Sequence, residues 1–355
     1  MRFNSLMSIA AASAVIALAG CSANSTSAIA PSPSSAGQAR TSHFASGRST
    51  LVLPPALQAR MGTPHTSNPN ASFDTCPSTG TLIYMSDGSL GVVNIYDSTL
   101  TLCGQLSGFS EPQGMTVHNH NLFVANTMGL NNGAAGDILA FHRGATTPYR
   151  KFIDPSGQFP VSVTVLTDNT VVGSNIFDST FTTGSISTWL RTGHFVGNFV
   201  PPNMAESFFV TNTDGDTIFS DGFDNINFVS AFWTMTCPSG ACTGMSEVGE
   251  AMSFPGGVID SKSGDIVASD QIGNTADTFE MPNLTPVTFT WTGAGDVDGI
   301  DSTEAFISNL YGADAGNNQV LCFTYRQSGH SPGTCGSVAG NSGGQAIGIA
   351  VDPGS

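Results

Sequence analysis

Six short motifs along the 355-residue chain each end in an Asp or an Asn residue. Every copy has an apolar residue, any residue, a small residue and then the acid or amide. Carboxylate and amide oxygens bind hydroxylated or cationic ligands, and Ca²⁺ takes several such oxygens. If the six residues share one face, they are candidate ligand-binding residues, and Ca²⁺ is the cation to expect. They are Asp87, Asn126, Asn175, Asp221, Asp270 and Asn309.

The same six residues also have a structural interpretation. Asp and Asn side chains accept hydrogen bonds from nearby backbone N–H groups and so cap turns. A structural repeat needs such a cap in every copy, whereas a functional site usually breaks the symmetry of its repeat. The regular recurrence therefore favours turn capping, and a ligand-binding ring is the alternative.

The other acidic and histidine residues form no familiar catalytic constellation. Asp214–Asp216 and Asp296–Asp301 resemble calcium loops, but neither has the twelve-residue spacing with a terminal Glu. The segment His118–His120 is predicted to be a solvated turn on the face opposite to the recurring acids and amides. The chain has neither a Gly-x-Ser-x-Gly elbow nor a glycine-rich phosphate loop.

The spacing of the motifs indicates the elements that carry them. Consecutive copies are 39 to 49 residues apart, which is the size of one four-stranded propeller blade. A short strand that opens with Pro or Gly precedes each motif, and an apolar residue with an aromatic three positions later follows it. These pairs are Val93/Tyr96, Ile138/Phe141, Ile186/Trp189, Val229/Phe232, Val320/Phe323 and, less clearly, Ala276/Phe279.

The two ends of the repeat region complement each other. The first motif strand, 82–87, has no inner strand of its own, and the strand at 346–352 has nothing after it. Pairing the two would remove exposed sheet edges. We therefore predict an all-β domain at 74–355, a six-bladed β-propeller closed by the C-terminal strand pairing into the first blade. A β-sandwich or β-helix would need shorter spacings.

Several strings in this region resemble the NHL-type repeat. Pro112–Val117, Asn121–Asn126 and Ile138–Phe141 are similar to its Pro-x-Gly strand, its Asn-Leu-Tyr-Val-Ala-Asp strand and its Ile-x-x-Phe strand. The resemblance covers nearly all of 82–352 and implies a propeller. Propellers of the NHL and gluconolactonase types include hydrolases, lyases and binding modules, so the resemblance leaves the function open.

Gluconolactonase-like enzymes hold one divalent metal at the axis with a Glu, amide side chains and an Asp. In this chain the strand that matches their early Glu, 344–352, contains no Glu. Asp270 and Asn309 are of the required kind and are the metal candidates that the resemblance implies. The residues favour a binding or scaffolding module that acts through the face of the Asp and Asn residues. A metal-dependent hydrolase or lyase is the alternative.

The N-terminus has the layout of a secretory signal, with Arg2 followed by an apolar run from Leu6 to Ala19. That run is too short to span a bilayer. The segment Leu18–Cys21 resembles the lipobox of bacterial lipoproteins, which implies removal of 1–20 and lipidation of Cys21. An ordinary signal peptide is the alternative. The residue after Cys21 is Ser, which implies sorting to the outer membrane in a host that has one.

Residues 21–73 are predicted to be a disordered tether. Of the 29 residues from Ser22 to Thr50, 22 are Ser, Thr, Ala, Gly or Pro, too few large apolar groups to offset chain ordering. From Asp74 onward there are 26 acidic and six basic residues, a net charge of −20 that repels nucleic acid. The expected partners are a membrane, through the lipid anchor, and a protein or carbohydrate. We expect the domain to be monomeric.

Six cysteines follow Cys21, an even number in a chain predicted to be exported. Fifteen pairings are available to six cysteines, and the spacings favour neighbours. No pair of close Cys-x-x-Cys knuckles suggests zinc. The predicted disulfides are Cys76–Cys103, Cys237–Cys242 and Cys322–Cys335.

Overall fold

A computed structural model describes most of the chain from Ser72 to Gly354. The signal segment, Cys21, the tether before Ser72, Asp74 and Asp214 lie outside the described residues. The described ranges are 72–73, 75–128, 135–177, 183–213, 216–224, 230–249, 255–260, 266–270, 275–280, 285–290, 294–302, 308–325 and 333–354.

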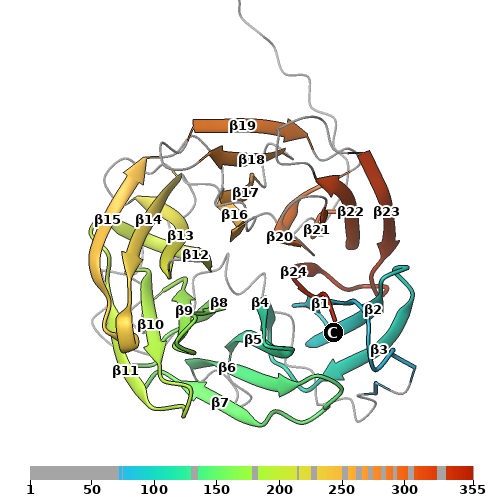
Figure 1. Ribbon diagram of the computed structural model, residues 1–355, viewed down its shortest axis with the longest axis horizontal. Coiled ribbons are helices and arrows are strands. Elements are labelled where there is room, and N and C mark those ends of the chain that lie inside the picture. Colours follow the sequence, from blue (N-terminus) through green and yellow to red (C-terminus); the bar gives the residue numbers. More distant parts are fainter. Residues whose placement is uncertain are drawn as a thin grey trace, which may run out of the picture.

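The described strands form an all-β propeller, and they belong to six four-stranded antiparallel sheets (Figure 1). The first sheet contains β24 (Ala346–Asp352), β1 (Leu82–Asp87), β2 (Val92–Asp97) and β3 (Leu102–Ser107). The second contains β4 (Pro112–His118), β5 (Asn121–Met128), β6 (Ala135–His142) and β7 (Arg150–Ile153). The third contains β8 (Pro160–Val165), β9 (Val171–Asn175), β10 (Ser185–Trp189) and β11 (Phe195–Phe199).

The remaining three sheets repeat this order. The fourth contains β12 (Met204–Asn212), β13 (Thr217–Asp224), β14 (Ser230–Thr236) and β15 (Thr243–Gly249). The fifth contains β16 (Pro255–Asp260), β17 (Ile266–Asp270), β18 (Thr275–Glu280) and β19 (Thr285–Thr290). The sixth contains β20 (Val297–Ser302), β21 (Ser308–Asp314), β22 (Gln319–Tyr325) and β23 (Gly333–Ala339). A single 3₁₀ turn, η1 (Pro238–Gly240), is the one helical element described, and no described helix could span a membrane.

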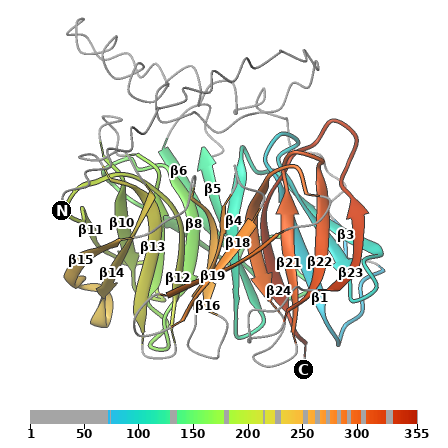
Figure 2. The ribbon, with the colours of Figure 1, turned by 90° about the horizontal axis from the view of Figure 1, so that it is seen from above.

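The innermost strands are β24, β4, β8, β12, β16 and β20 (Figure 1). Each contacts the next in that order, and β20 contacts β24. In the first sheet β24 pairs antiparallel with β1, with Leu82 opposite Asp352 and Ile83 opposite Val351. Figure 2 shows the sheets from the side, with the C-terminus at the lower edge. The prediction of an all-β propeller is confirmed.

Small residues let neighbouring inner strands approach each other closely. A Cβ added at Gly348 of β24 would lie 2.1 Å from the carbonyl oxygen of Gln113 on β4. One added at Gly299 of β20 would lie 2.7 Å from the carbonyl oxygen of Ile347 on β24. Real Cβ atoms do not approach backbone this closely, so these positions require glycine.

The hydrophobic core lies between facing sheets, as the alternating apolar residues of the strands require. Tyr84 of the first sheet packs with Leu122 of the second, and Phe123 of the second packs with Trp189 of the third. Tyr311 of the sixth sheet packs in one cluster with residues of the first sheet. The first and second sheets therefore bury side chains on both faces.

Three disulfides join the pairs of cysteines that the spacings favoured. Cys76–Cys103 ties the segment before β1 to β3, and an isolated bridge between Ser72 and Gln105 adds to the same join. Cys237–Cys242 encloses η1, and Cys322–Cys335 joins β22 to β23. Disulfides of this number are typical of proteins from an oxidising, extracytoplasmic compartment.

Candidate functional site

Four of the six predicted Asp and Asn residues lie at matching places near the ends of their strands. Asn126, Asn175 and Asp270 each pair with the Pro that opens the inner strand of their sheet, and Asp87 pairs with Ala346 in the same way.

The predicted strand ends are wrong in the fourth and sixth sheets. There β13 continues past Asp221, and Asn309 lies at the beginning of β21 instead of its end. The matching residues are Asp224, opposite Met204, and Asp314, opposite Val297. In the fourth sheet, the aromatic residues of the neighbouring strand β14 explain this shift from Asp221 to Asp224. The indole N–H of Trp233 donates to the carbonyl of Pro202, as that of Trp189 donates to Ile153, so Trp233 and not Phe232 is the matching aromatic.

Two of these strand-end side chains, Asp87 and Asn126, fasten their strands to the loop before an inner strand. Asp87 Oδ1 accepts hydrogen bonds from the N–H groups of Leu90, at 3.0 Å, and Gln345, at 2.9 Å. Asn126 Oδ1 accepts from the N–H groups of Ser110, at 2.9 Å, and Glu111, at 3.1 Å. Both side chains are fully buried. The contacts support turn capping.

Asp314 makes the most extensive cap. Its Oδ1 accepts from the N–H groups of Gly295, Asp296 and Asn317 at 2.9 to 3.2 Å. Its Oδ2 accepts from the side-chain amides of Asn317, at 2.9 Å, and Gln319, at 2.8 Å. The carboxylate is fully buried. It therefore has the capping role that the motif predicted, but it lies five residues after Asn309, the residue that the motif indicated.

The remaining predicted residues have separate local roles. Asn175 donates to the hydroxyls of Ser185 and Ser187 inside the third sheet. Asp221 Oδ1 accepts from the N–H of Phe209 at 2.6 Å. Asn309 is half-buried and lies five residues before Asp314, which is about 16 Å along a strand. A metal site at Asp270 and Asn309 stays a prediction. Ligand binding by the strand-end residues stays a prediction.

The small residue of the motif has a role of its own. The hydroxyl of Ser86 donates to the carbonyl of Gln113 at 2.7 Å, that of Ser174 to Phe208 at 2.5 Å, and that of Ser269 to Asp298 at 3.0 Å. Each acceptor lies on the inner strand of the following sheet. The recurring small residue thus joins adjacent sheets around the axis.

A cavity of about 470 Å³ lies at the opposite end of the inner strands. Residues from β4, β8, β12, β20 and β24 line it, together with the turn between β4 and β5. Its apolar wall includes Val117, Val163 and Ile300. Its polar groups include Thr116, His118, His120, Thr164, Asn212 and Asp301. We call it the axial cavity. The expected solvated turn His118–His120 forms part of its wall, on the predicted face.

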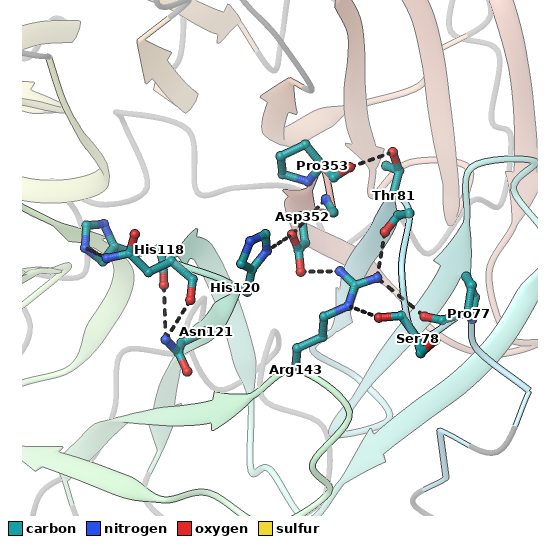
Figure 3. Close-up of polar contacts among 12 residues, drawn as sticks. Pro77, Ser78, Thr81, His118, His120, Asn121, Arg143, Asp352 and Pro353 are labelled. Atoms are coloured by element: carbon teal, nitrogen blue, oxygen red, sulfur yellow. Dashed lines mark hydrogen bonds and ion pairs between the residues drawn. The ribbon is translucent and has the colours of Figure 1, made fainter.

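The most connected carboxylate at the axial cavity is Asp352, at the end of β24 (Figure 3). His120 Nδ1 lies 2.8 Å from Asp352 Oδ1, and the N–H of Gly354 donates to the same oxygen at 3.0 Å. Arg143 forms an ion pair with the other oxygen, and its guanidinium also donates to the carbonyls of Ser78 and Gly80. Only 1 % of the Asp352 side chain is exposed, against 48 % of His120.

The charge states of Asp352 and His118, two groups at the axial cavity, follow from their surroundings. Burial raises the pKa of Asp352, but hydrogen bonds from His120, Gly354 and Arg143, with the charge of Arg143, hold it below its ordinary value. Burial, with the nearby charge of Arg191, lowers the pKa of His118. At neutral pH Asp352 is therefore an anion, and His118 is neutral.

The backbone of the β4–β5 turn is held in a conformation that L-residues rarely adopt. Asn119 has φ 49° and His120 has φ 58°. A two-residue hairpin turn with both central φ values positive normally has Gly at the second place, and a larger residue there costs about 1 kcal/mol. The turn directs the His120 imidazole to Asp352. Sequence reasoning missed the pair because its members are 232 positions apart.

Among the described residues, no group of three or more His, Cys, Asp and Glu side chains could hold a metal ion. No protein-family model matches the chain, and no curated protein matches its sequence.

The fold is similar to several solved propellers. One is a streptogramin B lyase, with 11 % identity and a TM-score of 0.54, over 82 % of this chain and 89 % of that one. A catalytically inactive virginiamycin B lyase from Staphylococcus aureus, solved with quinupristin, has 11 % identity and a TM-score of 0.51, over 76 % and 87 %. Hydrazine synthase from Kuenenia stuttgartiensis has 13 % identity and a TM-score of 0.51, over 73 % and 78 %. Similarity at this level shows the propeller fold alone.

Proposed function

We propose that this chain is an exported lipoprotein whose propeller binds a small ligand in the axial cavity. The observation that carries the proposal is the cavity itself. Its volume of about 470 Å³ is in the range of small-molecule sites, and its wall combines apolar side chains with a few fixed polar groups. The Asp and Asn face was the expected contact surface. Because Asp87, Asn126 and Asp314 on that face are buried in caps, the opposite end is the better candidate.

We further propose that the six sheets are the blades of one closed ring. The antiparallel pairing of β24 with β1 supports this, since it gives the first sheet its inner strand from the other end of the chain. The contacts between successive inner strands, including β20 with β24, support it as well. Such a ring holds the walls of the axial cavity at fixed distances.

The proposed location rests on two features of the sequence and one of the structure. The segment Leu18–Cys21 resembles a lipobox, and the following residues have the composition of a flexible tether. The three disulfides fit an oxidising compartment outside the cytoplasm.

A second candidate function is catalysis of the hydrolase or lyase kind, and the His120–Asp352 pair favours it. A buried carboxylate that accepts a hydrogen bond from one imidazole nitrogen fixes the tautomer and leaves the other nitrogen able to accept a proton. Similarity in fold to lyases gives only an analogy in this respect.

The test compares the exported chain, with Cys21→Ser to allow purification without detergent, with a variant whose cavity is filled. A small-molecule library is screened by ligand-observed NMR against this protein and against Thr116→Trp, since Thr116 is half-buried in the cavity wall. Leu102→Trp, on the exposed surface of β3, is the control. We expect compounds whose binding is lost only in Thr116→Trp. If the compounds bind equally to all three proteins, or if no compound binds, the axial cavity is not the ligand-binding site.

The same compounds separate the two candidate functions. Asn at position 120 keeps a side-chain N–H where His120 Nδ1 lies, tolerates the positive φ, and lacks a group at Nε2. Chemical conversion of a bound compound by the wild-type chain, lost in His120→Asn, would favour the enzyme. Binding without conversion favours the binding module.

A further inference from the structure

We propose that a groove between the second and third sheets, next to the axial cavity but separate from it, binds a single oxyanion, the carboxylate or phosphate group of a small ligand. We call it the oxyanion groove. Arg191 and the hydroxyl of Tyr149 are the groups that we assign to the anion, with the charge of Arg150 beside them.

The lining of the oxyanion groove is rich in hydrogen-bond donors. Its volume of about 30 Å³ holds one small group and not a whole ligand. Phe152 and Val171 form an apolar part of the wall, and Tyr149, Asn169 and Arg191 contribute N–H and O–H groups. None of the described residues that line the groove is Asp or Glu, whereas two aspartates line the axial cavity. The groove therefore suits an acceptor.

The second observation concerns the basic side chains. The described residues include four that are Arg or Lys. Arg143 and Lys151 each form an ion pair with a buried aspartate. Arg150 and Arg191 form no ion pair with any described residue, although the chain has 26 acidic residues. Two guanidinium groups are thus left for a partner outside the described part of the chain.

Both of these guanidinium groups lie beside Tyr149. Arg150 donates to the carbonyl of Thr192, the residue that follows Arg191. Burial raises the pKa of Tyr149, while the charges of Arg191 and Arg150 act in the opposite direction. The phenol is therefore protonated at neutral pH and can donate. Its ring stacks on that of His142, with centroids 4.0 Å apart and 8° between the planes, which fixes the position of the hydroxyl.

Two carboxylates in neighbouring loops are already engaged elsewhere. Asp216 Oδ1 accepts from the N–H of Thr167 at 2.9 Å. Asp168 accepts from the N–H groups of Thr170, at 2.8 Å, and Ser239, at 3.2 Å. Neither aspartate lines the groove, and neither forms an ion pair with the two guanidinium groups.

The net charge of the chain limits the size of the ligand. From Asp74 onward it is −20, which repels a polyanion along its whole length. At physiological ionic strength this repulsion decays within about 8 Å. A guanidinium acts at hydrogen-bond distance, and its planar fork matches both carboxylate and phosphate. A small ligand with one anionic group is therefore the class that fits the groove.

The experiment uses three probes that share one ring: D-glucose 6-phosphate, D-glucuronate and D-glucose. Their dissociation constants for the exported Cys21→Ser chain are measured near neutral pH by saturation-transfer NMR. We expect both anions to bind more tightly than glucose, and the tighter anion identifies the group. Arg191→Gln should weaken both by about fivefold, because one charge pair is lost. Lys151→Gln removes the same charge from an ion-paired residue and is the matched control.

Three further variants separate a specific site from diffuse charge. Arg191→Lys keeps the charge but loses the planar fork, so it should still weaken both anions. Tyr149→Phe removes the phenol O–H and should weaken both anions with an unchanged melting temperature. Thr116→Trp fills the axial cavity and should leave anion binding unchanged, because Thr116 does not line the groove.

Three results would each overturn the oxyanion groove. The first is glucose binding as tightly as the two anions, or no anion binding at all. The second is equal binding by Arg191→Gln and Lys151→Gln, which would mean that only the overall charge matters. The third is loss of anion binding in Thr116→Trp, which would place the anion in the axial cavity.

Discussion

Arg143 forms an ion pair with Asp352, a residue 209 positions further along the chain. The same guanidinium donates to the carbonyls of Ser78 and Gly80, in the segment that precedes β1. One side chain in the turn after β6 therefore joins both ends of the described chain.

Breaking this pair should lower the free energy of unfolding. Arg143→Gln leaves the buried carboxylate of Asp352 without its cation, and we expect a loss of about 3 kcal/mol in urea unfolding at neutral pH. Asp352→Asn should cost less, because an amide still accepts from Arg143 and Gly354. Arg191→Gln changes an exposed residue of the same type and is the control. Equal stability of the two Arg variants would show that the pair contributes nothing.

The lowered pKa of Asp352 predicts a dependence of stability on pH. Since its pKa in the folded chain lies below its ordinary, unfolded value, the unfolded state binds a proton first as the pH falls. The stabilisation is complete above the unfolded pKa and is lost as the pH falls through the folded one. Unfolding free energies measured across the acid range should fall less steeply for Asp352→Asn. Some slope should remain, because a hydrogen bond from the Thr99 side chain lowers the pKa of Asp97 as well.

Substitutions in the sixth sheet should show that Asp314, and not Asn309, is the residue that caps the strand end. Asp314→Ala removes the acceptor of three backbone N–H groups and should cost about 3 kcal/mol. Asn309→Ala removes one long contact, of 3.4 Å to the Tyr311 hydroxyl, and should cost under about 1 kcal/mol. Urea unfolding of both variants is the measurement. The reverse order would restore Asn309 as the capping residue.

The disulfides should differ in their contribution to stability. Cys76 and Cys103 are 27 positions apart, whereas Cys237 and Cys242 are five apart. Because a longer closed loop restricts the unfolded chain more, replacing the first pair by Ala should cost roughly 1.4 kcal/mol more than replacing the second. Thermal unfolding of the two double variants under oxidising conditions gives the comparison. A larger loss for the short loop would show that local strain in the turn, and not loop length, decides.

Lipidation is predicted for Cys21. In a bacterial expression host, the wild-type chain should separate with the membranes, and Cys21→Ser should be found in the soluble extracytoplasmic fraction. Mass spectrometry of the N-terminal peptide should show acyl groups on Cys21 alone. A free thiol at Cys21 in membrane-bound protein would contradict the prediction and leave another means of attachment.

The propeller fold was predictable from the sequence because the same order of strand patterns recurs in each repeat. The pairing of β24 with β1 was predictable because 82–87 lacked an inner strand and 346–352 lacked a partner. The residue that ends the strand in the fourth and sixth motifs was not predictable. In a chain rich in Ser, Gly and Asp, a four-residue motif also occurs beside the true strand end, as at Asp221. Only pairing with a neighbouring strand selects Asp224.

The axial cavity lay beyond sequence reasoning for a different reason. Its wall joins Thr116, Thr164, Asn212 and Asp301, which belong to four sheets and share no local pattern. One signal was present in the chain: a His residue at the second place of a hairpin turn, where glycine is normally found. A residue that is unfavourable for its turn is often retained for a contact elsewhere.

The fastening of the N-terminal segment to β3 determines how the domain would respond to mechanical load. A pull on the chain ahead of Ser72 passes through the Ser72–Gln105 bridge and the covalent Cys76–Cys103 link into the outermost strand. The tension bypasses the ladder between β1 and β24, which would otherwise separate bond by bond. The resistance of this region to such a load would thus last for as long as the Cys76–Cys103 crosslink stays oxidised.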